Sequence, residues 1–92
     1  MNKICFDDYS NTPSIIYEEH GTFYILVSRP LQSDPQLGHV ELSIVSNASA
    51  INYTNCIHNL TDPVDLKYAW PEPMPWQQII KRPLELIMEA LL

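Results

Sequence analysis

The stretch from Ser14 to Arg29, SIIYEEHGTFYILVSR, limits the possible folds of this chain more than any other stretch. Two runs of β-branched and aromatic residues flank Glu19-His20-Gly21, and Gly21 supplies the positive φ that a tight hairpin turn requires. The second run, Thr22 to Ser28, is apolar on both faces of a pleated strand, whereas a strand covered on one side alternates with polar residues. The pattern therefore predicts a β-hairpin whose second strand is central, with chain packed over each of its faces.

Other segments also favour strands. Lys3 to Phe6 fits a short first strand, and His39 to Ser46 alternates apolar and polar residues as a half-buried antiparallel strand does. Residues 50–58 are ambiguous, because their apolar positions fit one face of a strand or a helical stripe. Their β-branched content favours the strand.

Helix signals concentrate in the C-terminal third of the chain. Asp62 and Pro63 suit the N-cap and first position of a short helix, which Pro71 limits to about two turns. The prolines within Trp70–Trp76 (WPEPMPW) favour an extended segment. Apolar residues then recur at helical spacing: Trp76, Ile79, Ile80, Leu84, Ile87, Met88 and Leu91. Pro83 falls inside this stripe and would cost about 3 kcal/mol in a straight helix, so we expect a kink or a break there.

Together these elements predict a single α+β domain that spans residues 1–92. We expect a meander-like antiparallel sheet of about four to five strands, with the C-terminal amphipathic helix, kinked or broken near Pro83, packed on one face. Without a second covering layer, Tyr24 and Leu26 on the other face of the central strand would be exposed.

The charge balance narrows the class of partner. Five basic and eleven acidic residues give a formal net charge of −6. Nucleic acids and anionic membrane surfaces select for basic patches, so we expect neither as a direct ligand. Acidity suits a protein partner with a basic surface, such as a toxin, a nuclease or a defence complex, although it also serves solubility alone.

Targeting signals are weak. No apolar run approaches the ~20 residues of a membrane span, and the start, MNKICFDDYS, lacks the apolar core of a secretory signal. Cys5 and Cys56 are too few for a disulfide framework and are expected as small buried hydrophobes, which predicts a reducing, cytoplasmic location. Glycosylation sequons at Asn47, Asn52 and Asn59 support the alternative of a glycosylated extracellular or viral domain.

Catalytic signatures are missing from the sequence. There is no CxxC, HxxxH or HExxH spacing, and the best metal-ligand pair is Cys56 with His58 on one strand face. No G-x-S-x-G elbow marks a nucleophile, and two glycines cannot form a phosphate-cradling loop. We therefore expect no metal, no cofactor and no enzymatic activity.

Two sets of residues are candidates for partner binding. Acidic residues on expected turns and loops could steer a basic partner: Asp7, Asp8, Glu18, Glu19, Asp34, Asp62, Asp65 and Glu72. Tyr68 and Trp70 lead into the proline-stiffened segment, where an aromatic anchor loses little entropy on binding. The competing interpretation is that the carboxylates are exposed to solvent without binding a partner and that Trp70 and Trp76 pack at the edge of the core.

These observations favour a non-enzymatic, protein-binding function. Small, acidic, glycine-poor chains occur among immunity proteins and phage proteins that disable a host defence, and this analogy predicts an inhibitor that occludes a basic surface. The alternative is a structural domain that forms a homodimer or larger homo-oligomer through the sheet face or the C-terminal helix.

Overall fold

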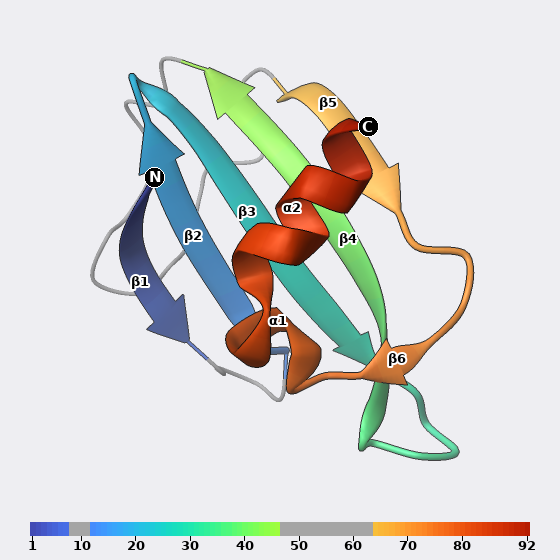
Figure 1. Ribbon diagram of the computed structural model, residues 1–92. Coiled ribbons are helices and arrows are strands. Elements are labelled where there is room, and N and C mark those ends of the chain that lie inside the picture. Colours follow the sequence, from blue (N-terminus) through green and yellow to red (C-terminus); the bar gives the residue numbers. More distant parts are fainter. Residues whose placement is uncertain (8–11, 47–63) are drawn as a thin grey trace.

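The computed structural model describes residues 1–7, 12–46 and 64–92 (Figure 1). Its elements are β1 (Asn2–Asp7), β2 (Ser14–Glu19), β3 (Thr22–Pro30), β4 (Leu37–Ser46), β5 (Val64–Ala69), β6 (Met74–Pro75), α1 (Gln78–Lys81) and α2 (Pro83–Leu91). The strands pair antiparallel in the order β1-β2-β3-β4-β5, and the short β6 pairs with the start of β4. The predicted α+β class with an antiparallel meander and a C-terminal helical region is confirmed, with six strands in the described part of the chain.

The β2–β3 hairpin forms where the sequence predicted it. Ile16 lies opposite Ile25, and the turn residues His20 and Gly21 have φ values of 52° and 81°. Positive φ at both central residues matches the right-handed twist of the two flanking strands. A carboxylate oxygen of Glu18 accepts the Gly21 N–H at 3.0 Å, which further fixes the turn.

Both faces of β3 are buried, as a central strand requires. Leu26 belongs to a cluster that joins the sheet to the helices: Ile15, Leu26, Val40, Leu42, Ile44, Ile79, Leu86 and Ile87. A second cluster lies on the opposite face: Ile16, Phe23, Ile25 and Val45. The helices thus lie over the face of Tyr24 and Leu26, for which the sequence predicted no cover, and Leu26 is fully buried.

The short helix expected after Asp62 is wrong, because Val64–Ala69 forms strand β5. Leu66 pairs with Ile44 and Tyr68 with Leu42, so a backbone ladder to β4 replaces the helical hydrogen bonds. Six residues make a marginal helix in isolation, and tertiary strand pairing overrides so weak a local preference. Asp62 and Pro63, residues 50–58 and the three sequons lie outside the described residues.

The C-terminal stripe is divided at Arg82, which has non-helical φ and ψ of −142° and 54° between α1 and α2. Ile79 and Ile87 are buried, but the stripe residues Ile80, Leu84, Met88 and Leu91 are exposed, whereas Leu86, outside the stripe, is fully buried. A single stripe assumes one continuous helix, and the non-helical residue changes the angular phase between the two segments. The predicted buried face was therefore only partly correct.

Candidate partner-binding surface

Strand β5 places the two candidate aromatic residues on the face that carries the helices. Tyr68 pairs with Leu42, whose side chain lies beneath the helices, and directly opposed residues of an antiparallel pair share a face. Trp70 follows two residues later, and its backbone N–H donates to the Val40 carbonyl at 3.0 Å. The rings of Tyr68 and Trp70 meet edge to face, with centroids 4.9 Å apart.

Polar side chains of the helical region complete the site. The indole N–H of Trp70 donates to Glu89 Oε2 at 3.3 Å, and Arg82 Nη1 donates to Glu89 Oε1 at 3.2 Å. Arg82 also lies 3.7 Å from a Glu85 carboxylate oxygen and donates through Nε to Gln78 Oε1 at 2.7 Å. Figure 1 shows α2 running across the sheet toward β5, which brings these groups to the aromatic pair. We call Tyr68, Trp70, Arg82, Glu85 and Glu89 the Trp70 cluster.

The Trp70 cluster is held in place at its base and open at its rim. Trp70 is half-buried against the core, whereas Tyr68 is 39% exposed. The side chains of Glu85 and Glu89 are 73% and 51% exposed, and the single guanidinium of Arg82 faces both carboxylates. Excess negative charge beside aromatic rings suits a Lys or Arg of a partner, through ion pairing and cation–π contact.

The acidic residues predicted from the sequence do not all meet at this cluster. Glu72 is exposed two residues beyond Trp70. Glu18 and Glu19 lie at the β2–β3 turn, at the opposite end of the sheet from the end of β5 (Figure 1). There Glu18 bonds to the turn, and Glu19 lies 3.7 Å from the amino group of Met1.

The remaining predicted residues are divided among other places. Asp7 lies in β1 opposite Ser14, and Asp65 lies in β5. Asp34 is exposed in the β3–β4 loop. Asp8 and Asp62 lie outside the described residues.

Sequence reasoning missed Arg82, Glu85 and Glu89 as members of the site. Their spacing of three and four residues is a signal that places charged side chains on one side of a helix. Nothing in that spacing identifies Trp70 as their neighbour, because the contact joins residues 19 positions apart through the packing of α2 on the sheet.

Two other features were sought in the described part of the chain: metal-ligand groups and membrane-spanning helices. They contain no group of three or more His, Cys, Asp or Glu side chains that could hold a metal ion. None of their helices has the length and apolar character needed to cross a membrane. Comparison of the chain with family models, with curated proteins and with solved structures finds no match.

Proposed function

We propose that this chain is a small non-enzymatic protein that binds a basic surface of another protein and inhibits that protein by occlusion, as immunity proteins and phage anti-defence proteins do. The observation that carries the proposal is the Trp70 cluster, in which an exposed Tyr68 stands edge-on to Trp70 beside the carboxylates of Glu85 and Glu89. Interface hot spots are enriched in such aromatic residues, and a cation of the partner is attracted to the face of an aromatic ring.

The local contacts support this role because they order the anchor before binding. Trp70 is fixed by its backbone bond to Val40 and its indole bond to Glu89, so little side-chain entropy remains to be lost. The ion pairs of Arg82 are solvent-exposed and contribute little to folding stability, so a partner's cation can compete for the carboxylates at low cost. The net charge of −6 steers a basic partner toward the molecule over longer distances.

The experiment begins with affinity capture from native lysate and mass spectrometry, which nominates a partner. The dissociation constant of that purified partner is then measured for the unmodified chain, for Tyr68→Ala and for Glu85→Gln. We expect Tyr68→Ala to weaken binding roughly tenfold or more, as truncation of an aromatic hot spot does. Phe6→Ala is the matched control. Phe6 is 41% exposed and Tyr68 is 39% exposed, but Phe6 lies on β1, at the opposite edge of the sheet from β5.

Thermal unfolding shows whether Tyr68→Ala retains the fold, so that a loss of binding is not confused with unfolding. A folded Tyr68→Ala that binds as tightly as the unmodified chain, together with a neutral Glu85→Gln, would show that the Trp70 cluster is not the binding surface.

A second candidate function is self-association through the helices. Ile80, Leu84, Met88 and Leu91 are 44%, 46%, 59% and 44% exposed and follow one another along α1 and α2. In an antiparallel pairing of two α2 helices, Leu84 of one copy would meet Met88 of the other, and Lys81 would approach the partially negative C-terminal turn. Sedimentation equilibrium tests this: a dimer abolished by Met88→Glu supports it, and a strict monomer at high concentration contradicts it.

A further inference from the structure

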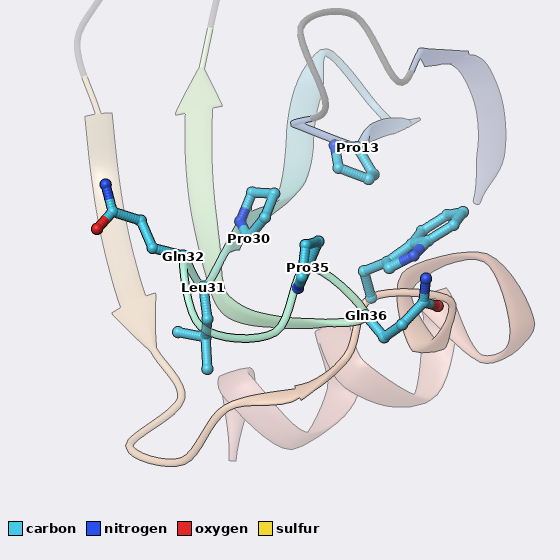
Figure 2. A pocket seen from close by; sticks show the side chains of 7 residues that line it. Pro13, Pro30, Leu31, Gln32, Pro35 and Gln36 are labelled. Atoms are coloured by element: carbon cyan, nitrogen blue, oxygen red, sulfur yellow. The ribbon is translucent and has the colours of Figure 1, made fainter.

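A pocket of about 480 Å³ opens at the end of the sheet opposite the β2–β3 turn. The end of β3 and the β3–β4 loop supply most of its wall: Pro30, Leu31, Gln32, Pro35 and Gln36. Pro13, just before β2, and Trp76, just before α1, complete it. Figure 2 shows Pro13, Pro30 and Pro35 around the same hollow.

The wall of this pocket is ordered before any ligand binds. The Leu31 N–H donates to the Leu37 carbonyl at 3.0 Å and closes the loop. Inside the loop, the Gln36 N–H donates to Asp34 Oδ1 at 3.1 Å. The Trp76 N–H donates to the Gln36 carbonyl at 3.2 Å, and the Gln77 amide donates to that of Gln36 at 3.3 Å. The wall also contains three prolines, whose φ is fixed, so a ligand would not have to order the wall.

The lining chemistry selects an uncharged ring. None of the seven lining side chains is ionisable, in a chain with sixteen Asp, Glu, Lys and Arg residues. An indole and pyrrolidine rings offer apolar faces, which favour an aromatic group by stacking and area burial. The indole N–H of Trp76 adds a hydrogen-bond donor to this lining.

The rim adds a charge of defined position. Asp34 directly precedes the lining residue Pro35, is exposed, and is oriented by its bond to the Gln36 N–H. A carboxylate beside a neutral pocket complements a cation that neighbours an apolar ring.

Resting on the proposed function, we infer that this pocket receives an aromatic side chain of the basic partner, from a segment in which Lys or Arg stands next to the aromatic residue. The Trp70 cluster and the pocket would then form two contacts of one interface, joined by the Trp70–Trp76 segment.

The test uses blocked tripeptides and NMR spectra of the ¹⁵N-labelled chain. The probes are acetyl-Arg-Phe-Arg-amide, acetyl-Arg-Ala-Arg-amide, acetyl-Glu-Phe-Glu-amide and acetyl-Phe-amide. We expect the first to shift the Trp76 indole signal and the loop amides of residues 31–37 saturably, and the other three to bind roughly tenfold more weakly or less. If acetyl-Arg-Ala-Arg-amide bound as tightly as acetyl-Arg-Phe-Arg-amide, the inference that the pocket receives an aromatic side chain would be wrong. If acetyl-Phe-amide or acetyl-Glu-Phe-Glu-amide bound as tightly, the inference that a neighbouring Lys or Arg contributes would be wrong.

Matched variants locate the effect. Leu31→Ala should weaken the Arg-Phe-Arg peptide several-fold, whereas Leu84→Ala, the same change on the exposed side of α2, should not. Asp34→Asn keeps an oxygen for the Gln36 N–H but removes the charge, so it should weaken the peptide while Glu19→Gln at the far end does not. Equal effects within either pair would overturn the assignment.

The two proposals fail separately. If no peptide binds the pocket while Tyr68→Ala still weakens the captured partner, the inference about the pocket is wrong and the proposed function stands. If the peptide binds while Tyr68→Ala and Glu85→Gln are neutral, the pocket stands and the role of the Trp70 cluster is wrong.

Discussion

The hydroxyl of Ser28 is fully buried on the helix-bearing face of β3 and has no hydrogen-bond partner within the described residues. An unpaired buried hydroxyl costs about 1–3 kcal/mol, because its bonds to water are lost on folding. We therefore expect Ser28→Ala to raise the free energy of unfolding by about 1 kcal/mol, measured by urea denaturation. A loss of stability in this variant would show that the hydroxyl is satisfied in solution.

Gly38 faces the same hydroxyl across the β3–β4 ladder. A Cβ at this position would meet Ser28 Oγ and lie 3.1 Å from the Arg29 carbonyl oxygen. Gly38→Ala should lower the free energy of unfolding by about 1–3 kcal/mol, through overpacking, and by clearly less when Ser28 is already Ala. Gly21→Ala is the control: its cost comes from a φ of 81° with open space around the Cβ, so it should be additive with Ser28→Ala. Additive behaviour of Gly38→Ala would contradict the contact.

Tyr17 predicts a pH dependence of stability. Burial raises the pKa of its phenol above the usual 10.0, because the charged form is less well solvated. The folded chain then keeps the proton where the unfolded chain has lost it, so this contribution is complete below pH 10.0 and is lost as the pH rises through the folded pKa. We expect the free energy of unfolding to fall less steeply with alkaline pH in Tyr17→Phe. Identical slopes in denaturation series would refute this.

Among the elements, α2 allows a direct test of which of its sides faces the sheet, by the same Leu→Ala substitution at two positions. Leu86 is fully buried and Leu84 is 46% exposed, although they stand two residues apart on α2. Leu86→Ala should cost about 2–4 kcal/mol of unfolding free energy through lost burial and a cavity, whereas Leu84→Ala should cost less than about 1 kcal/mol. Chemical denaturation measures both. Equal costs would mean that α2 is rotated relative to the packing described above.

Strand β5 forms although the residues before it favour the start of a helix. Asp62 and Pro63 are good helix-start residues, but the segment after them forms the last strand of the meander. Val64, Leu66 and Tyr68 also alternate at the strand period, so the sequence held both signals. Pairing with β4 decided between them, since the ladder satisfies the backbone along a whole edge.

For the whole molecule, the net charge of −6 predicts opposite effects of salt on the two candidate functions, binding of a basic partner and self-association. Attraction to a basic partner is screened by salt, so the association rate should fall as ionic strength rises. Two copies of this chain repel each other, so self-association through α2 should strengthen with salt. Stopped-flow association and sedimentation at low and high salt measure these trends. A partner whose on-rate is indifferent to salt would contradict electrostatic steering.

The parts of this protein that follow from neighbouring residues were predictable from the chain alone. The β2–β3 turn needs positive φ at Gly21. The continuous apolar run of β3 and the apolar–polar alternation of β4 are both visible in successive residues of the sequence. Tyr68 and Trp70 could be picked as a pair because both belong to one short aromatic, proline-rich segment. These are local properties, and the fold class follows from them.

Long-range contacts decided the rest. Which face of β3 the helices cover, the strand identity of β5, the burial of Leu86 in place of Leu84, and the bond from Trp70 to Glu89 all depend on how separate segments pack. The same holds for the pocket, whose wall joins Pro13, the β3–β4 loop and Trp76. No local pattern encodes such contacts, because their free energy arises only when the sheet and the helices are in place together.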